Sequence, residues 1–311
     1  MSAVNEDTIS LPYDIVHQVV QYMNIGYINI TLVAIGRNLT QKDKNKIRST
    51  RLDPIKYLSK LTNKPLALLS LMRNTKTILS GLRALEYFVP GSCTKNTRWE
   101  FYCENKHISI MLFISYLSLL GATFSPLIDV DIAKGVRFFN KLLGRITTNN
   151  RIYNIEVKWK NGECASYSLL SVDSSTLQCF ISGFAAVSMY HLLTSNNKFI
   201  LWKNNDKNIA ITRLNGEDDT SSSSDTEDDS KLRTTIYGKR IYINAIKSMG
   251  FKYTTYKKYV LSGYTTRSIG PYGVRLRYIG DKESCIIGFK SYIDTNSWIT
   301  PYDRYMYMLR Y

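Results

Sequence analysis

The amino-acid sequence predicts an α+β protein with a mixed sheet and flanking helices. Apolar residues recur at helical spacing in the first quarter of the chain, at 11–23 and 55–72, whereas residues 152–159 alternate between apolar and polar. A composition of 44% apolar and 21% charged residues excludes a mainly disordered, collagen-like or coiled-coil chain. Because helical and strand patterns do not alternate regularly, the order of elements favours α+β.

The first elements are expected to be helical. Leu11, Ile15, Val19 and Met23 share one helical face, and Pro12 suits a first turn. A second helical stretch over 55–72 follows Asp53-Pro54, which has the composition of an N-cap and first helical residue.

One short strand is expected next. Residues 77–79 lead into Ser80-Gly81, and the aromatic run at 98–103 has strand-forming composition.

Residues 108–128 contain no charge over 21 positions, which is long enough to span a bilayer. The serines of this segment, with Gly121 and Pro126, favour instead a buried helix that Gly121 ends. We therefore expect no membrane partner.

The clearest strand pattern lies at 152–159. Tyr153, Ile155, Val157 and Trp159 define its apolar face, and its polar face consists of Asn154, Glu156 and Lys158. A turn at 160–162 and a returning strand at 167–172 would complete a hairpin. Residues 176–193 have the apolar spacing of a helix after the cap-like Asp173-Ser174-Ser175.

The charge is unevenly distributed. The chain has 41 Lys and Arg against 25 Asp and Glu, a net +16, yet residues 216–230 hold seven acids and no base. Such a segment predicts a solvated acidic insertion, and the remainder then carries +23. We predict four regions: a helical 1–50, a core over 51–215, the acidic 216–230, and a basic, Tyr-rich 231–311 that belongs to the same fold.

The cysteines and histidines have no metal-binding spacing. The five cysteines contain no CxxC pair, and the three histidines are far apart. We expect reduced, mostly buried thiols, and the acidic N-terminus lacks the apolar core of a signal peptide, so we predict a cytoplasmic protein.

One run resembles a known group of proteins. Residues Ile78 to Cys103, ILSGLRALEYFVPGSCTKNTRWEFYC, are similar to a group of poorly characterised fungal proteins with a nucleotidyltransferase-like core, whose pattern is SGSRALEYFxPGS followed by SDWDFY. Further similar blocks lie at 53–75, 174–190 and 279–289, so the resemblance covers roughly 50–290. The opening LPYDIV is also similar to the start of an F-box helix.

The resemblance implies a nucleotide site. In that fold a Gly-Ser turn at a helix N-terminus holds phosphates, two carboxylates on the next strand hold Mg²⁺, and a third carboxylate on a later strand activates the attacking hydroxyl. Carried over by position, the resemblance assigns phosphate or nucleotide binding to Ser80, Gly81, Arg83 and Arg98. It makes Glu100 the metal ligand and, with Glu156, a candidate catalytic carboxylate, with Mg²⁺ as cofactor if the site is active.

The sequence departs from that pattern at two positions. Leu82 stands where the Ser after the glycine is expected, and Arg98 replaces the first Asp. Because an arginine stays protonated and cannot ligate Mg²⁺, we expect a degraded site that binds rather than catalyses. The alternative for Arg83 and Arg98 is a framework role in ion pairs with Glu86 and Glu100.

The expected function is therefore a non-catalytic nucleotidyltransferase-like binding protein. The abundance of residues with A/T-rich codons is similar to that of genes on yeast linear killer plasmids, which suggests an immunity factor against an RNA-cleaving toxin, with RNA or the toxin protein as partner. Residues 251–278 interleave tyrosines and cations as single-stranded nucleic-acid binders do, although strand-forming tyrosines explain the same pattern. Two alternatives stay open, namely an F-box-type ubiquitin-ligase adaptor that uses residues 11–23 and an Mg²⁺-dependent nucleotidyltransferase with a divergent site.

Overall fold

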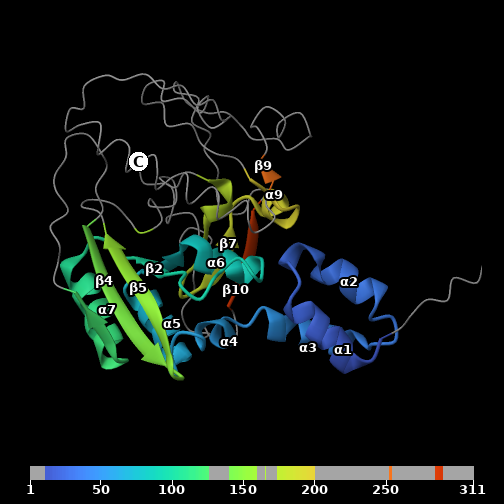
Figure 1. Ribbon diagram of the computed structural model, residues 1–311. Helices are drawn as coiled ribbons and strands as arrows, with labels where there is room; N and C mark the ends of the chain where they lie inside the picture. Colours follow the sequence, from blue (N-terminus) through green and yellow to red (C-terminus); the bar gives the residue numbers. More distant parts are fainter. Residues whose placement is uncertain are drawn as a thin grey trace, which may run out of the picture.

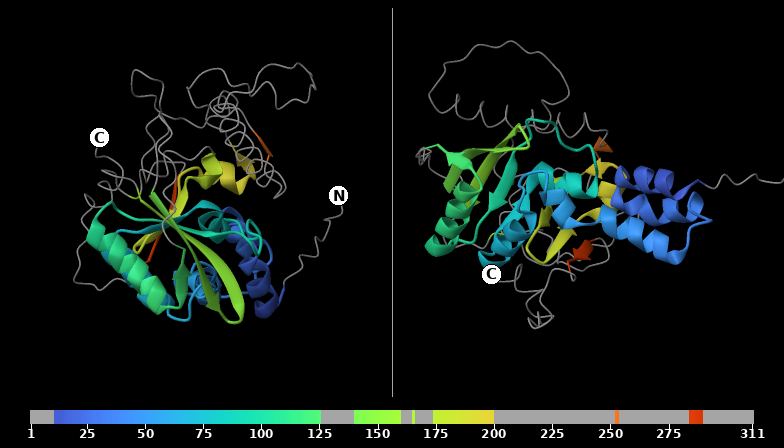
Figure 2. Two further views of the ribbon diagram at one scale, coloured as in Figure 1. Left: turned by 60° about the vertical axis from the view of Figure 1, so that its left-hand side comes forward. Right: turned by 90° about the horizontal axis from the view of Figure 1, so that it is seen from below.

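The computed structural model describes residues 11–125, 140–159, 165, 174–199, 252–253 and 284–289 (Figure 1). Its N-terminal part is helical, as predicted: α1 (Tyr13–Gln21), the 3₁₀ turn η1 (Ile25–Tyr27), α2 (Ile28–Ala34) and α3 (Gln41–Arg51). These helices bury a small core of their own, formed by Val16, Val20, Ile28, Leu32 and Ile47. They lie at one end of the molecule, away from β4 (Asn140–Thr148) (Figures 1 and 2).

The stretch predicted as one helix over 55–72 is two helices, α4 (Pro54–Leu58) and α5 (Pro65–Asn74). Asp53 caps α4 as expected, since its carboxylate accepts a hydrogen bond from the Ile55 amide at 2.8 Å. The break has a local cause, because Pro65 disfavours helical geometry at Lys64 and its ring starts a new helix.

Within the described residues, eight strands form one sheet in the order β10-β7-β6-β1-β2-β5-β4-β3. Only β2 (Trp99–Tyr102) and β5 (Arg151–Trp159) pair in parallel among these neighbours, so the sheet is mixed. The other members are β1 (Ile78–Ser80), β3 (Ala122–Phe124), β4 (Asn140–Thr148), β6 (Cys179–Ile181), β7 (Ala185–Ser188) and β10 (Cys285–Gly288). A separate pair joins β8 (Lys198–Phe199) to β9 (Lys252–Tyr253). The predicted class, a mixed α+β sheet with flanking helices and a helical N-terminus, is confirmed.

The main core lies on one face of the sheet. Leu79, Phe101 and Val157 occupy successive strands in register and are fully buried with side chains of α5, α6 (Gly81–Phe88) and α7 (His107–Leu119). Because side chains alternate along a strand, the residues between them face the other way, and these include Ser80, Glu100 and Glu156. The helices of the core thus leave the candidate residues on the opposite face.

The predicted helix over 108–128 forms but is shorter, and only part of it is buried. It ends where expected, with Gly121 in a left-handed conformation at φ +91°, and buries Ile110, Phe113 and Leu117. The other side exposes Ile108, Met111, Leu112 and Leu119. No helix in the described ranges combines the length and the apolarity needed to cross a bilayer.

The partner of β5 differs from the predicted one. The described partner is β4, which pairs antiparallel from Asn140 to Thr148 across a turn at Asn149 and Asn150, both with positive φ. Asparagine tolerates that backbone region better than most residues, which makes this turn favourable. The expected turn at 160–162 and strand at 167–172 lie outside the described residues.

The helix predicted over 176–193 is wrong. This stretch contains a 3₁₀ turn at Ser175–Leu177, then β6 and β7, and only the short α9 (His191–Ser195). The Ser182 hydroxyl accepts hydrogen bonds from the amides of Phe184 and Ala185 and so stabilises the bend between the strands. An apolar run of this length fits a buried strand as well as a helix, and β1 and β10 recruit it into the sheet.

The predicted region boundaries remain predictions, and 216–230 lies outside the described residues. Of the region 231–311, β9 and β10 are described, and β10 joins the main sheet through β7. Within the described part, Cys93, Cys103, Cys179 and Cys285 are free thiols.

The N-terminal helices contact the rest of the chain through α9. The Asn24 amide donates to the carbonyl oxygens of Thr194 and Ser195, both at 3.3 Å. A Cβ on Gly26 would overlap the Ser195 side chain, and His191 Nε2 would lie 3.6 Å from it. His191 is therefore packed into this contact, and burial lowers the pKa of its imidazole.

A pH effect on stability follows from His191. Because the pKa of His191 is lower in the folded chain, the unfolded chain binds a proton more readily as the pH falls. The contribution of the buried, neutral imidazole to the unfolding free energy is therefore complete above pH ~6.5 and is lost at lower pH. We expect His191→Gln to reduce the dependence of the unfolding free energy on pH between 6.5 and 5, by up to about 1.4 kcal/mol per pH unit. Urea unfolding across that range measures it. The exposed His107 supplies the control His107→Gln, and equal slopes in both variants would contradict the assignment.

Candidate functional site

The turn between β1 and α6 is the first part of the candidate site. Ser80 is fully buried on β1, and its hydroxyl donates to the Cys179 carbonyl oxygen at 3.0 Å. Gly81 begins α6 with φ +72°, and a Cβ placed there would lie 3.0 Å from Glu100 Oε1. The Glu100 carboxylate thus lies against the first residue of α6, where the helix dipole favours negative charge.

Gly81 is required for two separable reasons, its left-handed backbone and its closeness to Glu100. We expect Gly81→Ala to lower the unfolding free energy by about 1–2 kcal/mol for the backbone, with a further loss for the crowded carboxylate. Gly91 is the matched control, since it has φ +87° but no atom would lie within 4 Å of a Cβ at that position. Chemical denaturation should show a larger loss of unfolding free energy for Gly81→Ala than for Gly91→Ala. Equal losses would mean that the contact of the added Cβ with Glu100 does not destabilise the fold.

Two carboxylates lie next to each other on the face opposite the main core. Glu100 and Glu156 are register partners on the parallel strands β2 and β5, and Ser80 is the partner of Glu100 on β1. The Glu156 side chain is 8% exposed and that of Glu100 is 19% exposed. The sheet therefore brings together Ser80, Gly81, Glu100 and Glu156, four of the residues that the resemblance assigned to the site.

A lysine contacts both carboxylates. Lys158, two residues after Glu156 on β5, places Nζ 2.7 Å from Glu100 Oε2 and 3.4 Å from Glu156 Oε2. Tyr102 completes the cluster, with its hydroxyl 3.4 Å from the same Nζ and donating at 3.5 Å to Glu100 Oε2. Lys158 is thus a bound cation supplied by the chain itself.

The surroundings of Lys158 and Tyr102 shift the pKa of both side chains. Burial by itself would lower the pKa of Lys158, but the combined effects of Tyr102, Glu100 and Glu156 outweigh it and raise the pKa above the ordinary lysine value. Burial raises the pKa of Tyr102 to about 12, with Lys158 opposing the shift and Glu100 adding to it. At neutral pH the cluster therefore contains an ammonium and a neutral phenol.

Arg98 lies at the rim of this cluster. Its Nη1 is 3.6 Å from Glu156 Oε2, and its side chain is 51% exposed. The ion pair that the sequence left open as an alternative role for Arg98 is present, but its partner is Glu156 and not Glu100. Two of the four residues predicted to bind phosphate, Arg83 and Arg98, are cations. Arg98 is the accessible one of the two.

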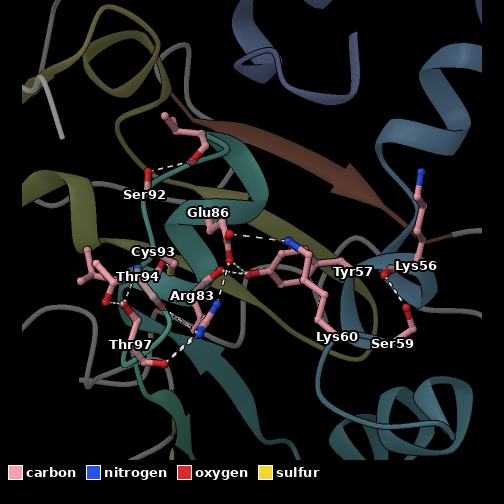
Figure 3. A network of polar contacts seen from close by, with 12 residues as sticks. Lys56, Tyr57, Ser59, Lys60, Arg83, Glu86, Ser92, Cys93, Thr94 and Thr97 are labelled. Carbon is pink, nitrogen blue, oxygen red and sulfur yellow. Dashed lines mark hydrogen bonds and ion pairs between the residues drawn. The ribbon is translucent and has the colours of Figure 1, made fainter. Parts of the chain in front are cut away.

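Arg83 has a different environment and is almost fully enclosed by protein. It forms an ion pair with Glu86 at 3.1 Å and donates to the carbonyl oxygens of Thr94 and Thr97 (Figure 3). Its guanidinium also lies over the Trp99 ring at 5.1 Å. Tyr57 donates to the Arg83 carbonyl oxygen, and Glu86 also pairs with Lys60 at 3.6 Å (Figure 3). These contacts favour the framework role for Arg83.

The residues present do not fit a catalytic Mg²⁺ site. Mg²⁺ requires oxygen ligands in octahedral geometry, whereas the space between Glu100 and Glu156 has the Lys158 ammonium within ion-pair distance of both. No group of three or more His, Cys, Asp or Glu side chains suited to a metal occurs in the described residues. The arrangement can hold an anion at its rim through Arg98, and the residues that the structure describes around it do not form a two-metal site.

Sequence reasoning did not recognise Lys158 as part of the site. The signal was available, because the strand alternation that placed Glu156 on the polar face also placed Lys158 there. Its distance from Glu100 could not be read from the sequence, since it depends on the parallel pairing of β2 with β5.

No protein-family model matches the chain, and no curated protein does. A search of solved structures finds distant similarity to a cytoplasmic RNA terminal U-transferase, with 12% sequence identity and a TM-score of 0.22. That match covers 51% of this chain and 37% of the enzyme.

Proposed function

We propose that this chain is a non-catalytic binding protein with a nucleotidyltransferase-like core. The observation that carries the proposal is the position of Lys158 Nζ, 2.7 Å from Glu100 and 3.4 Å from Glu156. In an active enzyme of the resembled type, those carboxylates would hold a divalent cation. Here an ammonium on the same strand neutralises them.

The charge balance supports binding over catalysis. Glu100 and Glu156 contribute −2, and Lys158 and Arg98 contribute +2, so the cluster has no surplus negative charge to attract Mg²⁺. Arg98 extends this balance to the surface, where its half-exposed guanidinium suits a phosphate or carboxylate group.

Metal binding and nucleotidyl transfer test the proposal together. We expect the wild-type protein to bind no Mn²⁺ by electron paramagnetic resonance and to add no labelled nucleotide to an RNA primer with Mg²⁺ or Mn²⁺. The Lys158→Ala, Arg98→Asp double variant should gain Mn²⁺ binding, because it removes both cations and adds a carboxylate.

The control is Lys141→Ala, Arg145→Asp, which makes the same charge changes on β4. Mn²⁺ binding by the control alone, or by both variants equally, would show that the Glu100–Glu156 pair is not the responsible site. Metal-dependent transfer by the wild-type protein that Glu100→Ala abolishes would overturn the proposal in favour of an enzyme. Transfer that survives Glu100→Ala would show that the assigned site is wrong.

The proposed biological context is protection against an RNA-cleaving killer toxin, with the toxin or its RNA target as partner. It is supported by the A/T-biased composition and the basic net charge. Cells that express the toxin should survive when they express the wild-type chain, and absence of protection would end this idea. Retained protection by both Arg98→Ala and Gly81→Arg would show that the site is irrelevant to it.

A ubiquitin-ligase adaptor is the second candidate, favoured by a specific observation. The N-terminal helices bury a separate core, while α1 exposes the apolar side chains of Ile15 and Val19. A pull-down with the Skp adaptor tests this function, and Ile15→Asp, Val19→Asp should abolish the interaction. Ile30→Asp, Val33→Asp on α2 is the matched control, and no interaction with the wild-type chain would exclude this candidate.

A further inference from the structure

The segment from 36 to 64, which includes α3 and α4, is strongly basic. It holds nine Lys and Arg residues against two Asp, a net +7 over 29 residues. This basic segment lies in the N-terminal helical part and is separate from the basic, Tyr-rich region 231–311 to which the sequence pattern pointed.

Both acidic residues of the segment are engaged at helix N-termini. Asp43 accepts a hydrogen bond from the Thr40 hydroxyl at 2.6 Å, and the Asp43 amide donates to that hydroxyl at 3.1 Å at the start of α3. Asp53 caps α4 through the Ile55 amide. Both carboxylates thus stabilise helix N-termini.

The cations of the segment divide into two groups. Arg51 is buried and donates to the Met23 carbonyl oxygen, Lys60 pairs with Glu86, and Lys56 donates to the Gln21 side chain. The other group forms no salt bridge among the described residues and comprises Arg37, Lys42, Lys44, Lys46, Arg48 and Lys64.

The exposed surface of α3 carries most of this second group. Ile47 and Arg51 point inward, so helical spacing places Lys42, Lys46 and Arg48 outward. Between these cations lie the neutral Gln41, Asn45 and Ser49, all exposed. A helix face of cations, amides and hydroxyls fits a chain of phosphates.

Aromatic rings accompany this face on the neighbouring helix α1. Lys46 Nζ lies 6.0 Å from the centre of the Tyr13 ring, which stacks on His17 at 5.9 Å. The Tyr13 ring is partly exposed beside Lys46, an arrangement that suits an unpaired base, because bases stack on aromatic side chains.

From this arrangement we propose that the outer face of α3, with Tyr13 of α1, binds single-stranded RNA without sequence preference. Lys42, Lys46 and Arg48 contact phosphates, and the Arg48 guanidinium is positioned for this by donating to Asn29 Oδ1 and Asn45 Oδ1, both at 3.1 Å. Asn45 Oδ1 also accepts from Gln41 Nε2 at 3.1 Å, so the Asn45 amide nitrogen can donate to the ribose 2′-hydroxyl and the Gln41 amide oxygen can accept from it. This surface does not include Glu100, Glu156 or Lys158. The inference therefore does not depend on the function proposed for that cluster.

Fluorescence anisotropy with a labelled 20-nucleotide oligouridine tests the surface on the full chain. The triple variant Lys42→Gln, Lys46→Gln, Arg48→Gln should raise Kd about 100-fold at 0.1 M salt, because each phosphate contact contributes a slope of about −0.7 to the dependence of log K on log salt. The salt slope itself should become shallower by about 2. Circular dichroism confirms that the variant is folded.

The matched control, Lys141→Gln, Arg145→Gln, Arg151→Gln, removes the same charge from β4 and β5 and should change Kd less than threefold. Equal losses in the two variants, or no binding by the wild-type chain, would overturn the proposed site. Equal or tighter binding of oligothymidine or duplex DNA would overturn the assignment to RNA. Binding of anionic phosphatidylserine vesicles without binding of RNA would show a membrane surface instead.

Discussion

Replacement of Lys158 by methionine is expected to destabilise the fold by about 3–5 kcal/mol. The substitution leaves Glu100 and Glu156, neighbours on parallel strands, without the cation that lies 2.7 and 3.4 Å from them. Removal of one partner from a buried charge cluster costs more than the cluster's net contribution, because the remaining charges stay desolvated. Urea unfolding of the variant and the wild-type chain measures the difference.

The pH range of this effect follows from the raised pKa of Lys158. A folded-state pKa above the unfolded value gives a contribution that is complete at neutral pH and is lost only as the pH rises past the ordinary lysine pKa. We therefore expect the cost of Lys158→Met to be constant between pH 6 and 9.

Two comparisons separate this effect from a general loss of charge. Lys141 is the register partner of Lys158 on β4, and Lys141→Met should cost less than about 1 kcal/mol. Addition of Glu100→Gln and Glu156→Gln to Lys158→Met should recover most of the loss, since no buried charge of the cluster is left unpaired and the half-exposed Arg98 is solvated. A cost below 1 kcal/mol for Lys158→Met, or no recovery in the triple variant, would refute the charge cluster as described.

The second large effect concerns Arg83, for which the sequence predicted the same phosphate-binding role as for Arg98. Arg83→Met is expected to cost about 3–5 kcal/mol, because the Arg83 side chain is 6% exposed and its loss leaves Glu86 without this partner and the Thr97 carbonyl oxygen without its guanidinium donors. Arg98→Met should cost less than about 1 kcal/mol, since a half-exposed ion pair contributes little.

Thermal and urea unfolding of the two arginine variants decide between framework and binding roles. A large loss for Arg83→Met with normal stability for Arg98→Met is the expected pattern. The reverse order would mean that the enclosed network around Arg83 does not stabilise the fold and that the rim arginine does.

Much of the fold could be predicted because its signals are local. The apolar spacing of α1, the Asp53 cap, the alternation of β5 and the stop at Gly121 all depend on residues within a few positions of each other. The helix predicted over 176–193 failed because the decision is not local. Residues 179–188 are buried strands only because β1 and β10 flank them in the sheet.

By itself the sequence identified Glu100 and Glu156 as the candidate carboxylates and Arg98 as an arginine where the resembled pattern has an aspartate, but it did not identify Lys158. The tertiary structure alone decided how those groups are paired. Parallel pairing of β2 with β5 brings Lys158 to Glu100, although 58 positions separate them. Contacts with Glu86 of α6, Thr94 and Thr97 enclose Arg83, while Arg98 stays accessible. The physical reason is that Coulomb energies depend on distance and burial in the folded state, and neither is encoded in the residue types one by one.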